Sequence, residues 1–484
     1  MKQMEYKFES NTQELKYKVL KAAAKAGFNK EKRVSKSKLA KEIIPGPKPS
    51  FRCCIHKERT IIKERLQIAL HEEKDESIIK VIDSACEQCP IQRYTVTDAC
   101  RGCIARSCEN SCPVDAVYMV AGRAYINYEK CIECGKCKET CQFNAISDTL
   151  RPCRRSCPVD AIEIDDSKIA KINYEKCISC GQCAYNCPFG AITDISYVKD
   201  VAQDLANKVP MYALIAPSIA SQFNNTKIGQ VTHSLKKIGF KDVIEVALGA
   251  DIVIKTETEE FIQRMEENNN YMTTSCCPSF VNLIEANAKD QVNHISTTVS
   301  PMVALGRLVK DLHKDAVTVF IGPCIAKKHE AKKPEFKDAI DYVITFEELR
   351  SLLGAKDIVV CDMPEDPLNN ASYQGRMFAV QGGVASSITN YIIDNNLDVD
   401  FQPVLSNGAK ECLKNINLAK YGKLKGNFIE GMACNGGCIS GPGSLTHQKK
   451  DANTIKQYAL KAKEKTTNDA LEVINTLNLK LHKK

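Results

Sequence analysis

INYEKCIECGKCKETCQFNAI, at residues 126–146, recurs as INYEKCISCGQCAYNCPFGAI at residues 172–192, and this duplicated stretch decides the fold of the region around it. A shorter segment repeats as well, as SCPVDAV at 111–117 and SCPVDAI at 156–162. Near-identical segments of this kind indicate duplication of a whole structural unit. Each unit contains few apolar residues, so we expect bound metal to form much of its core and the metal-free unit to be largely unfolded.

Cysteine spacing within the duplicated region predicts iron–sulfur clusters. Sixteen of the 25 cysteines lie between Cys86 and Cys187. A single CxxC pair would fit zinc or a redox dithiol equally well. The run CxxCxxCxxxC, which occurs twice and is once followed by Pro188, is the spacing of bacterial ferredoxins. In two-cluster ferredoxins, three cysteines of one motif bind one cluster and the fourth cysteine binds the other cluster.

This rule assigns three accessory 4Fe–4S sites and leads to a hypothesis for a fourth. Cys153 and Cys187 are left over in the second unit, and the upstream pair Cys86–Cys89 could complete their site. The alternative is that Cys86–Cys89 binds something separate and that the second unit holds one cluster. The expected ligands are Cys100, Cys103, Cys108 and Cys141 for site A, Cys112, Cys131, Cys134 and Cys137 for site B, Cys157, Cys177, Cys180 and Cys183 for site C, and Cys86, Cys89, Cys153 and Cys187 for site D.

Length and composition limit the number of domains and the cellular compartment that we expect for the chain. A chain of 484 residues is too long for one core, so several domains are expected. No window holds 18 uninterrupted apolar residues, and lysines interrupt the only candidate for a signal peptide. We therefore expect a cytoplasmic protein that does not enter a membrane, in a reducing compartment where cysteines ligate metal rather than form disulfides. Clustered iron–sulfur centres further suggest an anaerobic cell.

The positive charge of the chain is concentrated at its N-terminus. Residues 1–65 contain 18 Lys and Arg against 7 Asp and Glu, whereas the remainder is slightly acidic. This segment reads either as a solvated, partly disordered helical arm or as a docking surface for an acidic redox partner. Nucleic-acid binding is not expected, because the arm has no zinc finger and no interleaved aromatic residues. The adjacent pair Cys53 and Cys54 reads as ordinary thiols.

Five segments are expected along the chain. They are a basic helical region at 1–80, a first ferredoxin-like domain at 81–148, a second at 149–200, a domain at 205–450 and a C-terminal helix at 451–484. Residues 205–450 contain β-rich runs, such as VPMYALIAP at 209–217 and AVTVFIG at 316–322, that alternate with helical patterns. This alternation predicts an α/β domain preceded by α+β two-cluster ferredoxin-like repeats.

Three further cysteine motifs lie in the α/β domain: TSCCPSF at 274–280, GPCIAKKHE at 322–330 and EGMACNGGCISGPG at 430–443. Their combination resembles the FeFe-hydrogenases, whose signatures read TSCCPxW, PCxxKxxE and ExMACxxGCxxGGG. The resemblance covers about residues 205–450 and implies an H-cluster, in which a 4Fe–4S cubane shares a thiolate with a two-iron subcluster that carries CO, cyanide and a bridging dithiolate amine. It implies reversible reduction of protons to H2, with electrons relayed through the accessory clusters.

The resemblance also implies roles for individual residues. Cys277, Cys324 and Cys434 match cubane ligands, and Cys438 matches the thiolate that joins the cubane to the two-iron unit. Cys276 matches the cysteine that passes protons to the bridging amine. A proton path outward is expected to use two glutamates, a serine and an arginine, since these groups donate or accept protons and hydrogen bonds; an ordinary acidic helix face remains the alternative for the glutamates. The path residues are Glu257, Ser296, Glu260 and Arg264, and the residues expected to face the diiron ligands are Ala216, Pro217, Ser218, Lys327 and Met432.

Four residues depart from the family pattern, and all are expected near the active-site pocket. They are Phe280 in place of Trp, Met302 where Gln is frequent, Gly322 where Met is frequent, and Pro442 within the final glycine run. They leave two other interpretations open, a slow hydrogen sensor and a non-catalytic hydrogenase-like iron–sulfur protein; a simple polyferredoxin does not explain residues 205–450. No GxGxxG or P-loop indicates a nucleotide module, so the expected partners are ferredoxin, the hydrogenase maturases, H2 and protons, for a chain that acts as a monomer.

Overall fold

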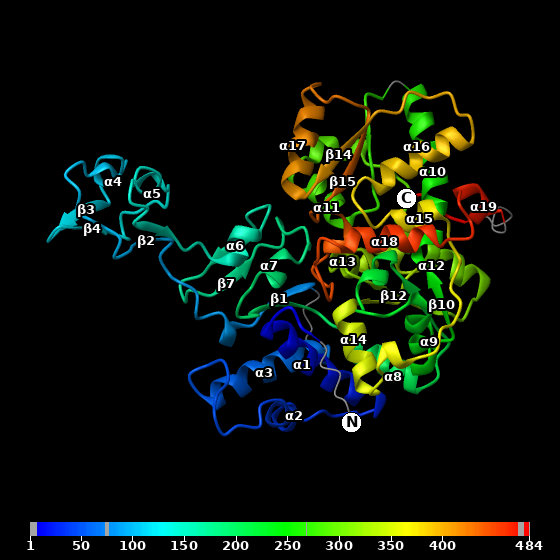
Figure 1. Cartoon of the computed structure of the whole chain (residues 1–484), viewed down its shortest axis with the longest axis horizontal. Coiled ribbons are helices and arrows are strands. Elements are labelled where there is room, and N and C mark those ends of the chain that lie inside the picture. Colours follow the sequence, from blue (N-terminus) through cyan, green and yellow to red (C-terminus); the bar gives the residue numbers. More distant parts are fainter. Residues whose placement is uncertain (1–6, 73–76, 268, 473–478, 484) are drawn as a thin grey trace.

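The computed structural model describes residues 7–72, 77–267, 269–472 and 479–483. A large mixed α/β body contains the chain from helix α8 (Val198–Ala206) onward, three N-terminal helices lie against it, and one small module stands apart from it (Figure 1). A second small module, which contains α6 (Pro152–Ser156), β7 (Ala170–Ile172) and α7 (Gln182–Tyr185), lies between this module and the large body. Among the described residues, no helix combines the length and the apolar character that crossing a bilayer requires.

The basic N-terminal region folds into helices α1 (Asn11–Phe28), α2 (Lys36–Ile43) and α3 (Ile55–Ala69). Helix α1 begins at Ser10, whose hydroxyl accepts a hydrogen bond from the Gln13 N–H group and so satisfies one free donor of the first turn. Val19, Leu20, Ala23 and Ala24 of α1 are buried in the main core, where the helix packs against α8 (Val198–Ala206) and α14 (Phe346–Ala355). The described part of the region is therefore a packed layer of the protein, and the expectation of a partly disordered arm is wrong for it.

Two ferredoxin-like modules follow, and one is inserted into the other. In the outer module β2 pairs with β5 and β3 with β4, all antiparallel. In the inner module β1, which precedes the outer module in sequence, pairs with β8, and β6 pairs with β7. The bounds are β1 (Ile79–Val81), β2 (Tyr94–Val96), α4 (Ser107–Asn110), β3 (Val117–Val120), β4 (Arg123–Ile126), α5 (Lys136–Glu139), β5 (Ile146–Asp148), α6 (Pro152–Ser156), β6 (Ile162–Ile164), β7 (Ala170–Ile172), α7 (Gln182–Tyr185) and β8 (Ile192–Asp194).

This nesting differs from the expected boundaries of 81–148 and 149–200. Ile79, Ile82 and Cys86 pack in one core with Cys153 and Ile192, so the segment before the outer module belongs to the inner one. The outer module has a small core of its own, built on Tyr94, Val117, Ala124, Ile126, Cys137 and Ile146. The stability of each module therefore depends on the group that its cysteines bind.

The α/β domain contains two parallel sheets. The first has the strand order β10–β9–β12–β13 and the second the order β11–β15–β14. Long helices surround both sheets and bury them (Figure 1). The strands are β9 (Met211–Ile215), β10 (Asp242–Glu245), β11 (Met272–Thr273), β12 (Val317–Gly322), β13 (Tyr342–Thr345), β14 (Pro403–Asn407) and β15 (Phe428–Met432), and the helices α9 (Ile228–Ile238), α10 (Val246–Glu266), α11 (Pro278–Asn287), α12 (Pro301–Leu312), α13 (Ala326–Lys332), α15 (Tyr373–Met377), α16 (Gly383–Asp394) and α17 (Ala409–Lys420).

The C-terminal segment is not the single helix expected for 451–484. It forms α18 (Asp451–Leu460) and α19 (Thr467–Leu471), and Thr466 starts α19 with a reciprocal capping bond to Asp469. The last described residues are extended: the Val299 N–H group donates to the Leu481 carbonyl oxygen, and the Lys483 N–H group donates to the Thr297 carbonyl oxygen.

Candidate active site and iron–sulfur sites

The four expected cubane ligands come from loops that follow parallel strands. Cys277 follows β11, Cys324 follows β12, and Cys434 and Cys438 follow β15. Residues 216–218 follow β9 in the same way. The carboxyl ends of parallel strands meet at one edge of a sheet, so residues far apart in sequence converge there. Loops that follow strands of both sheets line one cavity, which holds the site.

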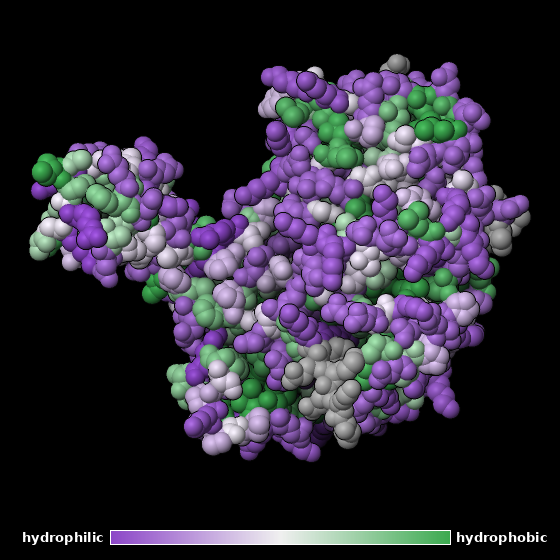
Figure 2. All heavy atoms as spheres, viewed as in Figure 1, coloured by the Kyte–Doolittle hydropathy of each residue, from purple (hydrophilic) through white to green (hydrophobic). Residues whose placement is uncertain are grey.

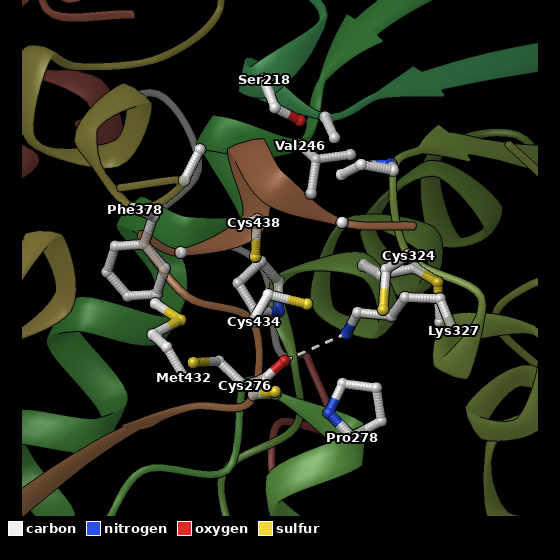
Figure 3. Close-up of a pocket in the computed structure, with 18 of the residues that line it drawn as sticks. Ser218, Val246, Cys276, Pro278, Cys324, Lys327, Phe378, Met432, Cys434 and Cys438 are labelled. Atoms are coloured by element: carbon white, nitrogen blue, oxygen red, sulfur yellow. Dashed lines mark hydrogen bonds between the residues drawn. The ribbon is translucent and has the colours of Figure 1, made fainter. Parts of the chain in front are cut away.

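One cavity of about 90 Å³ is lined by all four cysteines and by Cys276. Figure 3 shows sulfur atoms on several sides of this space, with the Phe378 ring and the Met432 thioether beside them. The remaining expected residues also line the cavity: Ala216, Pro217, Ser218 and Lys327. The structure therefore brings together every residue expected to hold or face the cofactor; the individual roles stay predictions.

The donor set fits an iron–sulfur cofactor. Burial raises the pKa of the Cys434 thiol well above its usual value, and the charges of Cys324 and Cys277 raise it further, so these thiols need a cation to ionise. In the described parts of the chain, no three His, Cys, Asp or Glu side chains are placed to hold a single metal ion. The thiolates of a 4Fe–4S cube bind four different irons, so they need not meet at one point.

Polar groups in the wall fit ligands that accept hydrogen bonds. The Ser218 hydroxyl is fully buried, lines the cavity, and has no partner among the described residues. Buried hydroxyl groups are nearly always paired, so this one is available to a bound group. The Lys327 ammonium donates to the Cys276 carbonyl oxygen at 3.2 Å and to Glu330 at 2.6 Å (Figure 3 shows the former). Glu330, which sequence reasoning missed, thus fixes the lysine at the cavity wall.

A row of proton-carrying groups leads from the cavity toward the surface. Glu257, on α10, is fully buried and close enough to Cys276 for its charge to raise the pKa of that thiol further, beyond the effect of burial. The Ser296 hydroxyl donates a hydrogen bond to Glu260 at 2.8 Å. The same hydroxyl also acts to lower the pKa of Glu257. Arg264 pairs with Glu260 at 2.7 Å. Glu257, Glu260 and Arg264 share one face of α10 because residues three or four apart are neighbours on a helix.

The two carboxyl groups of this row have opposite protonation tendencies. Burial, followed by the charge of Glu260, raises the pKa of Glu257 to about 8. Burial acts to raise the pKa of Glu260 too, but bonds from the Thr297 N–H group and the hydroxyls of Ser296 and Thr298 hold it below its usual value. At neutral pH Glu257 therefore holds a proton and Glu260 is an ionised acceptor. The threonines, also missed, follow Ser296 directly in sequence.

The accessory cysteines group as expected for sites A, B and C. Burial, together with the charges of Cys131, Cys134 and Cys112, raises the pKa of the Cys137 thiol to about 11. Burial is the largest cause that raises the pKa of the Cys108 thiol, and the charges of Cys141 and Cys103 also act to raise it. Burial and then Cys180, Cys177 and Cys157 raise the pKa of Cys183 well above its usual value. In each group, the cysteine expected to cross from the other motif is present.

The four cysteines of site D also lie together. Burial, Cys187, Cys86 and Cys89 each act to raise the pKa of Cys153, which reaches about 11. The backbone repeats the outer module here: the Ala170 N–H group donates to Cys86 Sγ at 3.4 Å, as Ala124 does to Cys100 at 3.5 Å. The pattern Cys100–Cys103–Cys108–Cys112 is thus matched by Cys86–Cys89–Cys153–Cys157, interrupted by the inserted module. This matched spacing is the signal that supports site D in the sequence itself.

Three family models match the chain. They are the iron-only hydrogenase large subunit, C-terminal domain, over residues 209–442, a 4Fe–4S binding domain over 124–147, and the LdpA Fe–S cluster-binding domain over 146–198. The first match spans all four cubane cysteines and the cavity built by them. The chain is an FeFe-hydrogenase-like protein. Its fold is a ferredoxin-like 4Fe–4S region followed by a hydrogenase-type α/β domain.

Several known proteins are similar to this FeFe-hydrogenase-like chain. Iron hydrogenase 1 of Clostridium pasteurianum is 30% identical over 294 residues, which cover 51% of each chain. The periplasmic [Fe] hydrogenase large subunit of Nitratidesulfovibrio vulgaris is 29% identical, over 54% of this chain and 76% of the relative. The human nuclear prelamin A recognition factor is 26% identical, over 47% and 61%. The chain thus spans about half the length of the first of these relatives.

A solved structure that concerns oxygen inactivation of an [FeFe]-hydrogenase aligns with a TM-score of 0.48 at 20% identity. The alignment covers 57% of this chain and 92% of that chain.

The four departures from the hydrogenase pattern occupy different surroundings. Met302 lines the cavity. Gly322 lies beside it, because a Cβ atom there would fall 2.5 Å from the Phe320 ring, which itself lines the cavity. Phe280, by contrast, is buried in a separate core under Gly431. Pro442 borders a polar pocket shared with Cys187. All four residues therefore lie at or beside the cavity, as expected, because Ser279 and Gly441, the chain neighbours of Phe280 and Pro442, line it.

Replacing Glu257 with Gln should change how stability depends on pH. The folded protein keeps Glu257 protonated up to about pH 8 whereas the unfolded chain ionises near pH 4.5, so this group adds stability at low pH that is lost as the pH rises between those values. Glutamine stays neutral, so the variant should gain up to about 5 kcal/mol relative to wild type at pH 9, and much less at pH 6.

Melting temperatures of the iron–sulfur-loaded protein at pH 6 and pH 9 measure this difference. Glu259→Gln, on the same helix but exposed, is the matched control and should show the same pH dependence as wild type. Equal pH dependence in Glu257→Gln and wild type would show that Glu257 is already ionised at neutral pH.

Proposed function

We propose that this chain is a hydrogenase that catalyses the reversible reaction 2 H⁺ + 2 e⁻ = H2. The observation that carries the proposal is one cavity that borders two kinds of route at once. The route for protons is the row from Cys276 to Arg264, and the route for electrons begins at Cys180, a site C cysteine that lines the same cavity. A protein that only stored or transferred clusters has no need for the first route.

The cysteines Cys277, Cys324, Cys434 and Cys438 would hold the H-cluster, which supplies the iron centre where H2 is formed or split heterolytically. The chain's own residues do the rest. Lys327, held by Glu330, keeps a positive charge at the cavity wall. Cys276 moves a proton between the cavity and Glu257, and Ser296 hands it on to Glu260. Apolar neighbours such as Phe378 and Met432 keep bulk water out.

Electrons would move along a line of five sites. Arg154, next to Cys153 of site D, pairs at 3.8 Å with Glu133, next to Cys134 of site B. Cys153 of site D lies close enough to Cys183 of site C for its charge to raise the pKa of that thiol. Cys180 of site C raises the pKa of Cys434 in the same way. A Cβ atom at Gly181 would lie 2.5 Å from Ile325, which shows how closely the loop of site C approaches the loop of Cys324. The order A, B, D, C and then the cavity follows.

The outer module is the point of electron entry in this proposal. Cys103 and Cys134 are exposed there, and the same module carries Ile104, Tyr118, Val120 and Tyr125, which expose apolar area. Figure 2 shows this mixed apolar and polar surface on the separate module. The partner is a ferredoxin or similar small carrier, and the protein is a cytoplasmic monomer that the hydrogenase maturases load.

Maturation of the protein with hydrogenase maturases tests the proposal. We expect infrared bands of CO and cyanide together with H2 evolution from a reduced carrier. Bands without appreciable turnover would support a hydrogen sensor, an alternative that the Met302 and Gly322 replacements at the cavity favour. Neither bands nor turnover would support a non-catalytic iron–sulfur protein, in line with the similarity to the nuclear prelamin A recognition factor.

A further inference from the structure

Three arginines with unpaired donors surround site D. Arg65 and Arg151 are each only 5% exposed, and Arg52 is half-buried. Among the described residues, Arg52 Nε, Arg65 Nε and Arg151 Nη1 have no hydrogen-bond partner, although all three atoms are buried. None of the three guanidinium groups forms an ion pair within the described parts of the chain. Buried arginine donors without an acceptor are costly, so they indicate a negatively charged group that belongs between them.

Each arginine is fixed close to a cysteine of site D. The Arg52 Nη2 group donates to the Ala85 carbonyl oxygen at 3.2 Å, one residue before Cys86. The Arg65 Nη2 group donates to the carbonyl oxygens of Phe189 and Gly190, just after Cys187, and Arg65 shares a pocket wall with Cys187. Arg151 lies close enough to Cys86 and Cys89 for its charge to act to lower the pKa of both thiols. The nearby carboxyl group of Glu58 accepts three backbone N–H groups through its Oε1 atom.

The duplicated module provides an internal comparison. Arg106 precedes Cys108 by two residues, as Arg151 precedes Cys153. The Arg106 side chain is 56% exposed and pairs with Glu109, so its charge is largely screened. Arg52 and Arg65 have no counterpart in the outer module, because both come from the N-terminal helical region that covers only the inner one. At site A the charge of Arg123 acts on Cys100, but the Arg123 side chain is 39% exposed and pairs with Asp98 at 2.8 Å, whereas the arginines around site D have no ion pair among the described residues.

We propose that Arg52, Arg65 and Arg151 hydrogen-bond to a 4Fe–4S cluster at site D and make it the most easily reduced accessory cluster of the chain. One-electron reduction adds one negative charge to the cluster and breaks no bond; the electron comes from the carrier of the proposed function, or from dithionite in a titration. Buried positive charge and hydrogen bonds to cluster sulfur both stabilise the reduced form. The N-terminal region thus has the function of setting a redox potential.

The consequence is an electron-storing site in the middle of the relay. A protein that holds one electron keeps it at site D, between the outer module and site C. Burial lowers the pKa of Arg65 only to about 10, so its charge is present at neutral pH. The inference needs site D to bind a cluster but does not need the H-cluster, so it stands or falls separately from the proposed function.

Redox titration of the full-length protein, loaded with 4Fe–4S clusters and followed by electron paramagnetic resonance, tests the proposal. In wild type, the first signal that appears on reduction should come from site D. The Cys89→Ala variant should lack this signal and should contain about one cluster less iron and sulfide than wild type. Arg65→Gln and Arg151→Gln should each make this cluster about tenfold harder to reduce, which is about 59 mV for one electron, at unchanged iron content. Arg65→Lys, which keeps the charge, should shift it less.

Arg155→Gln is the matched control, because Arg155 lies on α6 with Cys153 but is exposed. It should leave every midpoint unchanged. Should Arg65→Gln lose iron, Arg52→Gln, on the more exposed side of the site, provides the same measurement. The proposal is overturned if Cys89→Ala keeps all its iron, if another cluster is reduced first, or if the midpoint is the same in wild type and in the iron-replete glutamine variants.

Discussion

A Cys276→Ala variant, matured with the H-cluster, should keep the CO and cyanide infrared bands and lose turnover by about 10²–10⁴-fold. Cys276 lines the cavity without being one of the four expected cubane ligands, and it lies close enough to Glu257 for an ionised Glu257 carboxylate to raise the pKa of the Cys276 thiol. Alanine has no proton to pass, so the cavity loses its connection to Glu257, Ser296 and Glu260. H2 evolution from a reduced carrier, compared at equal band intensity, measures the effect.

Two variants sharpen this test. Cys276→Ser keeps a hydroxyl group that can both donate and accept, so it should retain more turnover than alanine does. Cys361→Ala removes a thiol outside the cavity, in the short helical turn Val360–Asp362, and should be as active as wild type. A fully active Cys276→Ala variant would rule out the relay, and loss of its bands would show that the thiol holds the cofactor instead.

A Lys328→Met variant should lose about 3–5 kcal/mol of stability. Lys328 is completely buried, and its ammonium group pairs at 2.7 Å with both Asp194 and Glu348. Asp194 is shared with Lys16 of helix α1, so this network joins the N-terminal region, the end of β8, α13 and α14. Removal of the lysine leaves buried carboxylates with too little positive charge, a penalty that the added apolar contact of methionine does not offset.

Melting temperatures of the iron–sulfur-loaded protein measure this loss. The matched control is Lys314→Met, which breaks an ion pair with Asp311 whose lysine side chain is 77% exposed and which should cost at most about 1 kcal/mol. The ion pairs also hold the pKa of Asp194 well below its usual value, so they add stability above about pH 4 that is lost at more acid pH. A melting temperature equal to that of the control would show that the network contributes no net stability.

The cysteine spacing alone predicted the grouping of sites A, B and C. Two or three residues between thiolates allow only a turn, so the first three cysteines of a motif face one space, and the ferredoxin rule assigns the fourth cysteine to the other cluster. The α/β character of the large domain was also predicted, because strands and helices differ in the period of their apolar residues. The bounds of individual elements depended on the tertiary structure, since strand β10 ends at Glu245 and helix α10 begins at the next residue, Val246.

The nested modules were beyond this reasoning. The order of segments in a sequence does not say which of them pair, and β1 finds its partner β8 more than one hundred residues later, across the inserted module. The pairing of the last described residues with Thr297 and Val299 has the same origin, since both partners are distant in the sequence.

What the sequence by itself determined is chemistry that depends on spacing: which thiols, carboxyl groups and hydroxyl groups exist, and which lie within one turn of another. Only the tertiary structure decided their surroundings. It removed water from Arg65 and Arg151 but not from Arg106, although Arg151 and Arg106 hold the same place in the repeat. The physical reason is that ligand identity is covalent and local, whereas charge strength and protonation depend on the dielectric surroundings, which distant segments create by covering a site.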